Sequence, residues 1–100
     1  MKVRAKIKNG VTTVKAIIYH TMESGSRKDK ETGELIPAHF IKEIKGELNG
    51  DVIISAEWGT GVSKNPYWSF KFEGGSPGDK VTISWTDNKG ETGSGEAVIK

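Results

Sequence analysis

The chain has 100 residues, 34% of them hydrophobic and 28% charged, with a formal net charge of +2 and a pI near 8.9. This length predicts a single domain, spanning residues 1–100, with one modest core. The lack of cysteine excludes disulfides, thiolate nucleophiles and cysteine-based metal sites. No apolar run approaches the ~18 residues of a membrane span, so we expect no membrane contact.

The basic residues are spread along the chain instead of forming a block. Lysine or arginine alternates with apolar residues at positions 2–8, as on the solvated face of a strand. In the loop that follows His20, Arg27 and Lys28 are followed at once by Asp29. Without a basic block or an RNA-binding signature, we expect no nucleic-acid partner.

Strand patterns begin at the N-terminus. Residues 2–8 alternate cleanly, and residues 12–20 are rich in β-branched side chains. Asn9-Gly10 between them is typical of a tight hairpin turn. The N-terminal residues do not form the continuous apolar stretch of a signal peptide, so we expect a chain that is cytoplasmic, already processed, or exported with a partner.

Two further strands are predicted after a long charged loop at residues 21–37. The first spans residues 38–48, and Asn49-Gly50 then turns the chain into a strand at residues 51–58. Residues 36–48 also fit a helical i, i+4, i+8 stripe. Pro37, Gly46 and the following hairpin signal favour the strand.

Three more alternating runs complete the pattern, at residues 67–72, 80–86 and 95–100. The last strand could present Ala97 and Ile99 to the core, or Val98 if its register shifts by one residue. Seven short strands separated by turn signals predict an all-β fold, an immunoglobulin-like antiparallel β-sandwich.

No catalytic set emerges from the residues. His20 and His39 flank the charged loop and could approach each other, with Glu23 or Asp29 completing a metal site. Two partly exposed imidazoles at strand ends are the simpler interpretation, so we predict no metal and no cofactor. A serine triad built from Ser24, His20 and Asp29 lacks the elbow and oxyanion turn that it would need.

The paired carboxylates of a glycosidase are not specified by the sequence, and neither glycine-x-glycine sequence precedes a predicted helix. We therefore predict that the protein is not an enzyme.

A protein interface is the stronger hypothesis. Long loops in small domains are usually functional or disordered, and this loop carries both an adaptable methionine and an arginine. Trp58 and Tyr67 flank a second connection, where exposed aromatic rings could anchor a partner or stack on a sugar. The candidate interface residues are Met22, Glu23, Arg27, Asp29, Trp58, Asn65, Pro66 and Tyr67.

The ordered combination of several short motifs resembles one known family. The motifs are Met22-Glu23-Ser24-Gly25-x-Arg27-Lys28-Asp29, Ile36-Pro37, Asn49-Gly50, Val52, Ala56, Ser63-x-Asn65-Pro66-Tyr67, Phe70, Trp85-x-Asp87 and Gly90. The chain resembles SoxZ, the Z subunit of the bacterial sulfur-oxidation (Sox) carrier complex. It departs from that family at Thr21, where a proline is common, in its short connection at Asn9-Gly10, and at Trp58, where an aliphatic residue is common.

The resemblance implies a non-catalytic scaffold that forms a heterodimer with SoxY, whose C-terminal cysteine carries intermediates of thiosulfate oxidation. It also implies transient docking of the Sox enzymes, room for assembly beyond the heterodimer, and a periplasmic location reached by co-export with the partner. The alternative left open by the residues is a carbohydrate-binding or adhesive module that uses exposed Trp and Tyr side chains.

Overall fold

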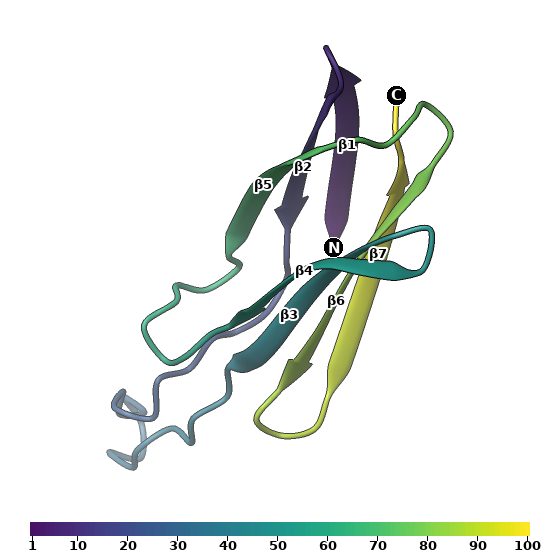
Figure 1. Cartoon of the computed structure of the whole chain (residues 1–100). Helices are drawn as coiled ribbons and strands as arrows, with labels where there is room; N and C mark the ends of the chain where they lie inside the picture. Colours follow the sequence, from purple (N-terminus) through teal and green to yellow (C-terminus); the bar gives the residue numbers. More distant parts are fainter.

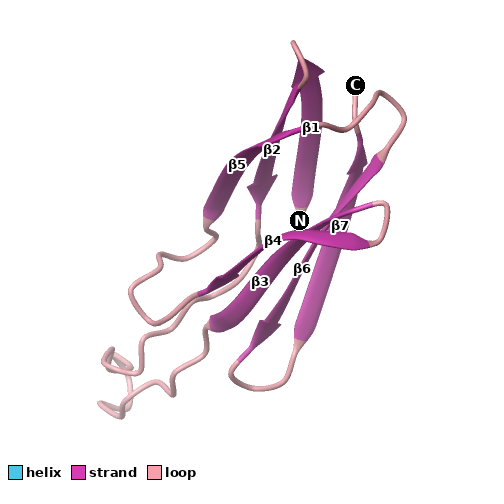
Figure 2. Ribbon diagram, in the orientation of Figure 1, coloured by secondary structure: helices cyan, strands magenta, loops and turns pink.

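The computed structural model describes residues 1–100 as two antiparallel sheets with no helix. The sheets pack face to face in an elongated body of 53 × 20 × 16 Å (Figures 1 and 2). One sheet has the strand order β1-β2-β5 and the other β4-β3-β6-β7. The strands are β1 (Lys2–Lys8), β2 (Val11–Ile17), β3 (Ile41–Leu48), β4 (Asp51–Glu57), β5 (Tyr67–Glu73), β6 (Lys80–Asp87) and β7 (Thr92–Val98). The predicted sandwich of seven strands is confirmed.

The connectivity is a variant of the immunoglobulin arrangement. In constant immunoglobulin domains the fourth strand pairs with the fifth, whereas here β4 pairs with β3 and joins the larger sheet. One side of the sandwich is closed, because the Lys100 N–H donates to the Ala5 carbonyl at 3.2 Å and the Ile7 N–H donates to the Lys100 carbonyl at 3.1 Å. The helical alternative for residues 36–48 is wrong, since residues 41–48 pair on both sides as a central strand.

Alternation decides which side chains enter the core. The fully buried apolar residues come from strands of both sheets and from the segments that follow β2 and β7, and include Val14, Ile18, Ile44, Ile83 and Ile99. The last strand takes the register in which Ile99 is buried and Val98 is 53% exposed. It also begins three residues earlier than predicted, because glycine and serine at positions 93–95 pair with β6 despite their low strand propensity.

Bulges adjust the pattern in β3 and its partner. The register shifts between Ile41 and Glu43 and again between Gly46 and Glu47. Each shift accommodates one extra residue, so a simple two-residue period fails across it. This is why Ile41 is fully buried at the start of β3, whereas the neighbouring Phe40 is only partly buried.

Candidate functional site

The charged loop between β2 and β3 forms an arm, defined here as residues 21–37, that extends beyond the end of the sandwich (Figure 1). Its two limbs are joined by antiparallel bridges from Glu23 to His39 and from Lys28 to Leu35. The Glu23 N–H donates to the His39 carbonyl at 2.7 Å, and the His39 N–H returns a bond to Glu23 at 2.9 Å. The arm is thus a hydrogen-bonded hairpin with a defined root at residues 20 and 39.

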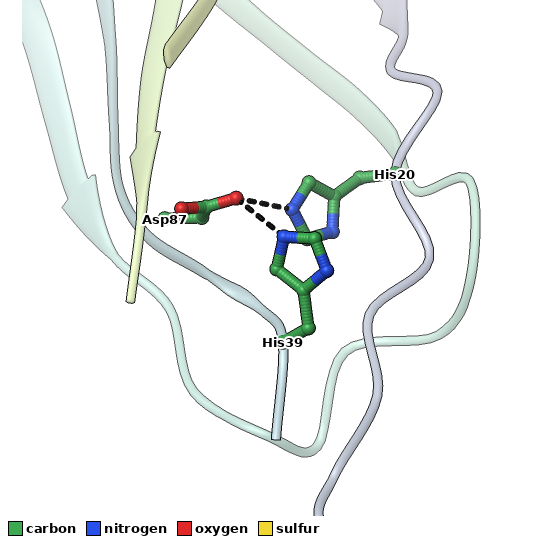
Figure 3. A group of neighbouring side chains, drawn as sticks. All are labelled: His20, His39 and Asp87. Atoms are coloured by element: carbon green, nitrogen blue, oxygen red, sulfur yellow. Dashed lines mark hydrogen bonds and ion pairs between the residues drawn. The ribbon is translucent and has the colours of Figure 1, made fainter. Parts of the chain in front are cut away.

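Three polar side chains meet at that root: His20, His39 and Asp87 (Figure 3). One Asp87 oxygen, Oδ2, lies 3.0 Å from Nε2 of His20 and 2.7 Å from Nε2 of His39. The two histidine rings pack edge to face with centroids 4.7 Å apart, and His20 packs in the same way on Trp85. Asp87 is the last residue of β6, so this cluster fastens both limbs of the arm to the four-stranded sheet.

The Asp87 carboxylate uses all of its acceptor capacity. Its other oxygen, Oδ1, accepts the backbone N–H groups of Lys89 and Glu91 at 3.0 and 2.9 Å. Burial opposes ionisation of this group, but the hydrogen bonds from His20, Glu91, His39 and Lys89 outweigh it and lower the pKa of Asp87 to about 2. Asp87 is therefore a fully satisfied buried anion.

The geometry also tests whether the cluster can hold a metal. Its three donor atoms lie within 4.8 Å of one another, close enough for a shared ion. However, the Met22 N–H donates to Nδ1 of His20 at 3.0 Å, which leaves the ring proton of neutral His20 on Nε2, facing Asp87. To bind a metal, Nε2 would have to lose that proton. The hydrogen bonds therefore favour a structural anchor over a metal centre.

The sequence-based view of these histidines needs correction in two respects. His20 is only 7% exposed, so it is not a partly solvated imidazole at a strand end. Neither Glu23 nor Asp29 completes the cluster; Asp87 does, and Glu91 adds a contact of 3.3 Å to His39. The third group comes from a distant strand, which spacing around the loop could not reveal.

Met22 belongs to the core and not to a free surface. It is 6% exposed, its backbone adopts a positive φ of 48°, and its sulfur accepts the Ile41 N–H at 3.4 Å. The bond from the Met22 N–H to His20 turns the chain inward at this point. The thioether is thus buried within this chain, unlike the free interface contact that the sequence led us to expect.

Asn65 and Pro66 position the segment that leads into the anchor. The Asn65 side chain accepts the His20 N–H at 3.0 Å, and the Asn65 N–H donates to the His20 carbonyl at 2.9 Å. Pro66 is buried, and its carbonyl accepts the N–H of Ile18 at 3.0 Å. These contacts hold the His20 backbone in position. They require the positive φ of 51° at Asn65, a conformation that asparagine tolerates better than most residues.

Glu23, Arg27 and Asp29 lie on the arm. Arg27 forms a two-point ion pair with Glu23, with its Nε 3.2 Å from Oε2. Hydrogen bonding to Arg27 is the main reason that the pKa of Glu23 is lowered. Asp29 accepts the N–H groups of Glu31 and Thr32 and so closes the turn at the tip. Arg27 and Asp29 are exposed, so both remain candidates for contact with a partner.

The aromatic residues do not share one platform. The rings of Trp58 and Trp68 pack edge to face with their centroids 6.1 Å apart, and both are partly buried against the core. Tyr67 points from the opposite face of β5 and is 60% exposed. A sugar-stacking surface made of these side chains is therefore not assembled.

Tyr67 instead joins two exposed side chains that the sequence interpretation missed. It is the register partner of Ile17 on β2, and Tyr19 follows two residues further along. Ile17 is 40% and Tyr19 53% exposed; we call these three residues the apolar corner. The alternation of residues 12–20 could have placed Ile17 and Tyr19 on one outer face, but the pairing with Tyr67 required the sheet order.

The fold and the site together define a small β-sandwich protein with a firmly rooted arm and an exposed apolar corner. Residues 1–98 match the family described as "Sulphur oxidation protein SoxZ", and the chain belongs to this family. It is thus a component of the sulfur-oxidation system, in a family that is generally non-catalytic. No curated protein sequence matches the chain.

Proposed function

We propose that this protein is the non-catalytic scaffold of a SoxYZ-type carrier, paired with a SoxY-like subunit whose C-terminal cysteine carries the sulfur intermediates. Family membership supports a role in sulfur oxidation. Because this chain contains no cysteine, covalent carriage on a thiol would have to occur on another polypeptide. The scaffold would hold that subunit and bring Sox enzymes to it.

The apolar corner is the structural feature that supports pairing of this chain with a SoxY-like subunit. Ile17, Tyr19 and Tyr67 expose 40–60% of their surface and lie together on the outer face of the three-stranded sheet, next to the root of the arm. Tyrosine is enriched at interface hot spots because its large rigid ring loses little conformational freedom on binding. We place the centre of the SoxY contact here, with Arg27 and Asp29 of the arm at its rim.

A permanent heterodimer buries roughly 1,000 Å² or more on each partner. That is about one sixth of the 6373 Å² accessible to solvent on this chain. The isolated chain would expose this surface, and we expect it to self-associate.

We further propose a periplasmic location, reached by export together with the partner. The structure contains no helix long and apolar enough to cross a membrane.

Affinity capture of the tagged chain from its native source, read by intact-mass spectrometry, tests the proposal. We expect a stoichiometric partner that ends in a cysteine-bearing tail, with part of the population carrying sulfur adducts. Recovery of a monomeric chain without a partner would contradict the scaffold function. A clean monomer at high concentration would further argue against an exposed permanent interface.

A further inference from the structure

The outer face of the three-stranded sheet gathers half of the lysines and arginines that form no ion pair in this molecule. We define this cationic face by the outward lysines and arginine of its strands: Lys2, Arg4, Lys6, Lys8, Lys15 and Lys71. The one acidic residue on it is Glu73, at the end of β5. None of the six basic side chains takes part in an ion pair.

The alternation of residues 2–8 already places four of these basic side chains on one face of β1. Lys15 and Lys71 join them because the sheet order is β1-β2-β5 and each strand turns alternate positions outward. The rest of the chain holds nine basic and twelve acidic residues and is therefore negative. The molecule is strongly dipolar despite its net charge of +2.

The arrangement works against the stability of the isolated chain. Arg4 and Lys15 are direct register partners, and like charges in directly opposite positions destabilise a sheet. The outer face of the other sheet differs: Lys45 lies 3.8 Å from Glu47, and Lys80 lies 3.5 Å from Glu96. Similar pairing was open to the cationic face and is missing from it.

Protection of a sheet edge does not explain the whole face. Lysines often guard exposed edge strands against aggregation. However, the free edge of β1 is partly covered by Lys100, which bonds to Ala5 and Ile7. Lys15 lies on β2, the central strand of the sheet. Its charge therefore requires another reason.

We infer that the cationic face is a docking surface for a second, transient protein partner that presents Asp and Glu side chains. Lysine is depleted in the cores of permanent interfaces, so this face suits a fast, salt-sensitive encounter better than a permanent contact. The inference rests on the proposed scaffold function, and it names the surface at which the proteins that act on the carried sulfur dock. A protein is favoured over a polynucleotide because Ile17, in the apolar corner, is the register partner of Lys2.

Charge reversal on the face, with a matched control elsewhere, tests the inference. One variant carries Lys6→Glu, Lys15→Glu and Lys71→Glu; the control carries the exposed substitutions Lys28→Glu, Lys30→Glu and Lys89→Glu. Both variants have the same net charge. The probes are poly-L-glutamate, a 20-base-pair DNA duplex and phosphatidylglycerol vesicles, tested at several salt concentrations against the chain alone and against its purified complex with the captured partner.

We expect poly-L-glutamate to bind the chain and the complex alike, at least tenfold more weakly to the face variant than to the control. Binding should weaken sharply as salt rises above ~0.1 M, where the screening length falls below about 10 Å. If both variants lose affinity for poly-L-glutamate equally, the binding depends only on net charge, and the inference is overturned. Stronger binding of DNA or vesicles would overturn it in favour of those ligands.

Measurements on the purified complex distinguish the proposed scaffold function from the proposed docking at the cationic face. If the chain alone binds poly-L-glutamate but the complex does not, the permanent partner covers the face, and the inferred second partner is wrong while the scaffold function stands. If no partner is captured, the scaffold function fails whatever the probe shows. A folding check accompanies the variants: removing the Arg4–Lys15 repulsion with Lys15→Glu alone should leave the melting temperature unchanged or raise it.

Discussion

At the scale of single residues, Asp87 organises the base of the arm. Its two oxygens accept four hydrogen bonds, from two imidazoles and two backbone N–H groups, while its side chain is excluded from solvent. A buried charge is tolerated only when it is satisfied in this way. Histidine and aspartate, which could signal catalysis or metal binding, here hold the loop to the sheet.

Replacing Asp87 with asparagine should lower the free energy of unfolding by about 2–4 kcal/mol. The amide would place its own NH₂ group against donors that now bond to the carboxylate. Urea denaturation at neutral pH measures the loss. A change below about 1 kcal/mol would show that the anchor does not stabilise the fold.

The low pKa of Asp87 should make the stability of the fold sensitive to acid. The pKa of Asp87 is about 2 in the folded protein against an ordinary value of 3.8, so its ionised form favours folding by about 2 kcal/mol. This contribution is complete above about pH 4 and is lost as the pH falls through about 2. Denaturation between pH 5 and pH 2 should show a shallower decline for Asp87→Asn than for the natural chain; parallel curves would contradict the assignment.

Met22 fills part of the core beside the anchor. Met22→Ala should lower the free energy of unfolding by about 2–4 kcal/mol, because it leaves a cavity there. Met22→Leu, of similar volume, should cost less than about 1.5 kcal/mol. Urea denaturation compares the two. Equal stability of the alanine variant and the natural chain would return Met22 to the list of surface candidates.

At the scale of elements, β7 is shaped by small residues that let its neighbour pack. A Cβ added at Gly93 would overlap the ring of Trp85, its register partner on β6. That ring in turn packs edge to face on His20 with centroids 5.0 Å apart. A glycine in the last strand thus supports the geometry at the root of the arm.

Gly93→Ala should therefore destabilise the protein by about 1–3 kcal/mol through overpacking, and should change the tryptophan fluorescence. Gly59→Ala is the matched control, since a Cβ there meets no atom within 4 Å and the backbone needs no positive φ. Thermal melts of the two variants give the comparison. Similar melting temperatures would mean that Trp85 moves aside without cost.

At the scale of the whole molecule, the three-stranded sheet carries both proposed contact surfaces. The apolar corner lies where β2 and β5 meet near the arm, and the cationic face covers the rest of the sheet. The four-stranded sheet instead holds the anchor and pairs its lysines at positions 45 and 80 with glutamates. We expect assembly to take place on one side of the sandwich.

Tyr67→Ala should weaken binding of the SoxY-like partner by about 1–2 kcal/mol, a five- to thirtyfold change in Kd, if the ring is an anchor at the interface. Ser69→Ala, on the same outer face two residues further along β5, should leave binding unchanged. Calorimetric titration with the captured partner gives both values, and circular dichroism confirms folding. Equal affinities would remove Tyr67 from the interface.

How much of this could be predicted from the sequence depends on the range of the interaction. Alternation and Asn-Gly turns depend on neighbouring residues, so they determined the seven strands, the hairpins at Asn9-Gly10 and Asn49-Gly50, and the sandwich class. The composition determined that any sulfur-carrying thiol lies outside this chain. The ordered motifs also led to the family.

Which distant side chains meet depends on how the strands and loops pack in three dimensions. The pairing of His20 and His39 with Asp87, the burial of Met22, and the meeting of Ile17 with Tyr67 all depend on how distant segments pack together. So does the addition of Lys15 on β2 and Lys71 on β5 to the basic face of β1, since these residues approach only when their strands lie side by side. Strand pairing joins positions far apart in the chain, and a local pattern carries no record of which strands become neighbours.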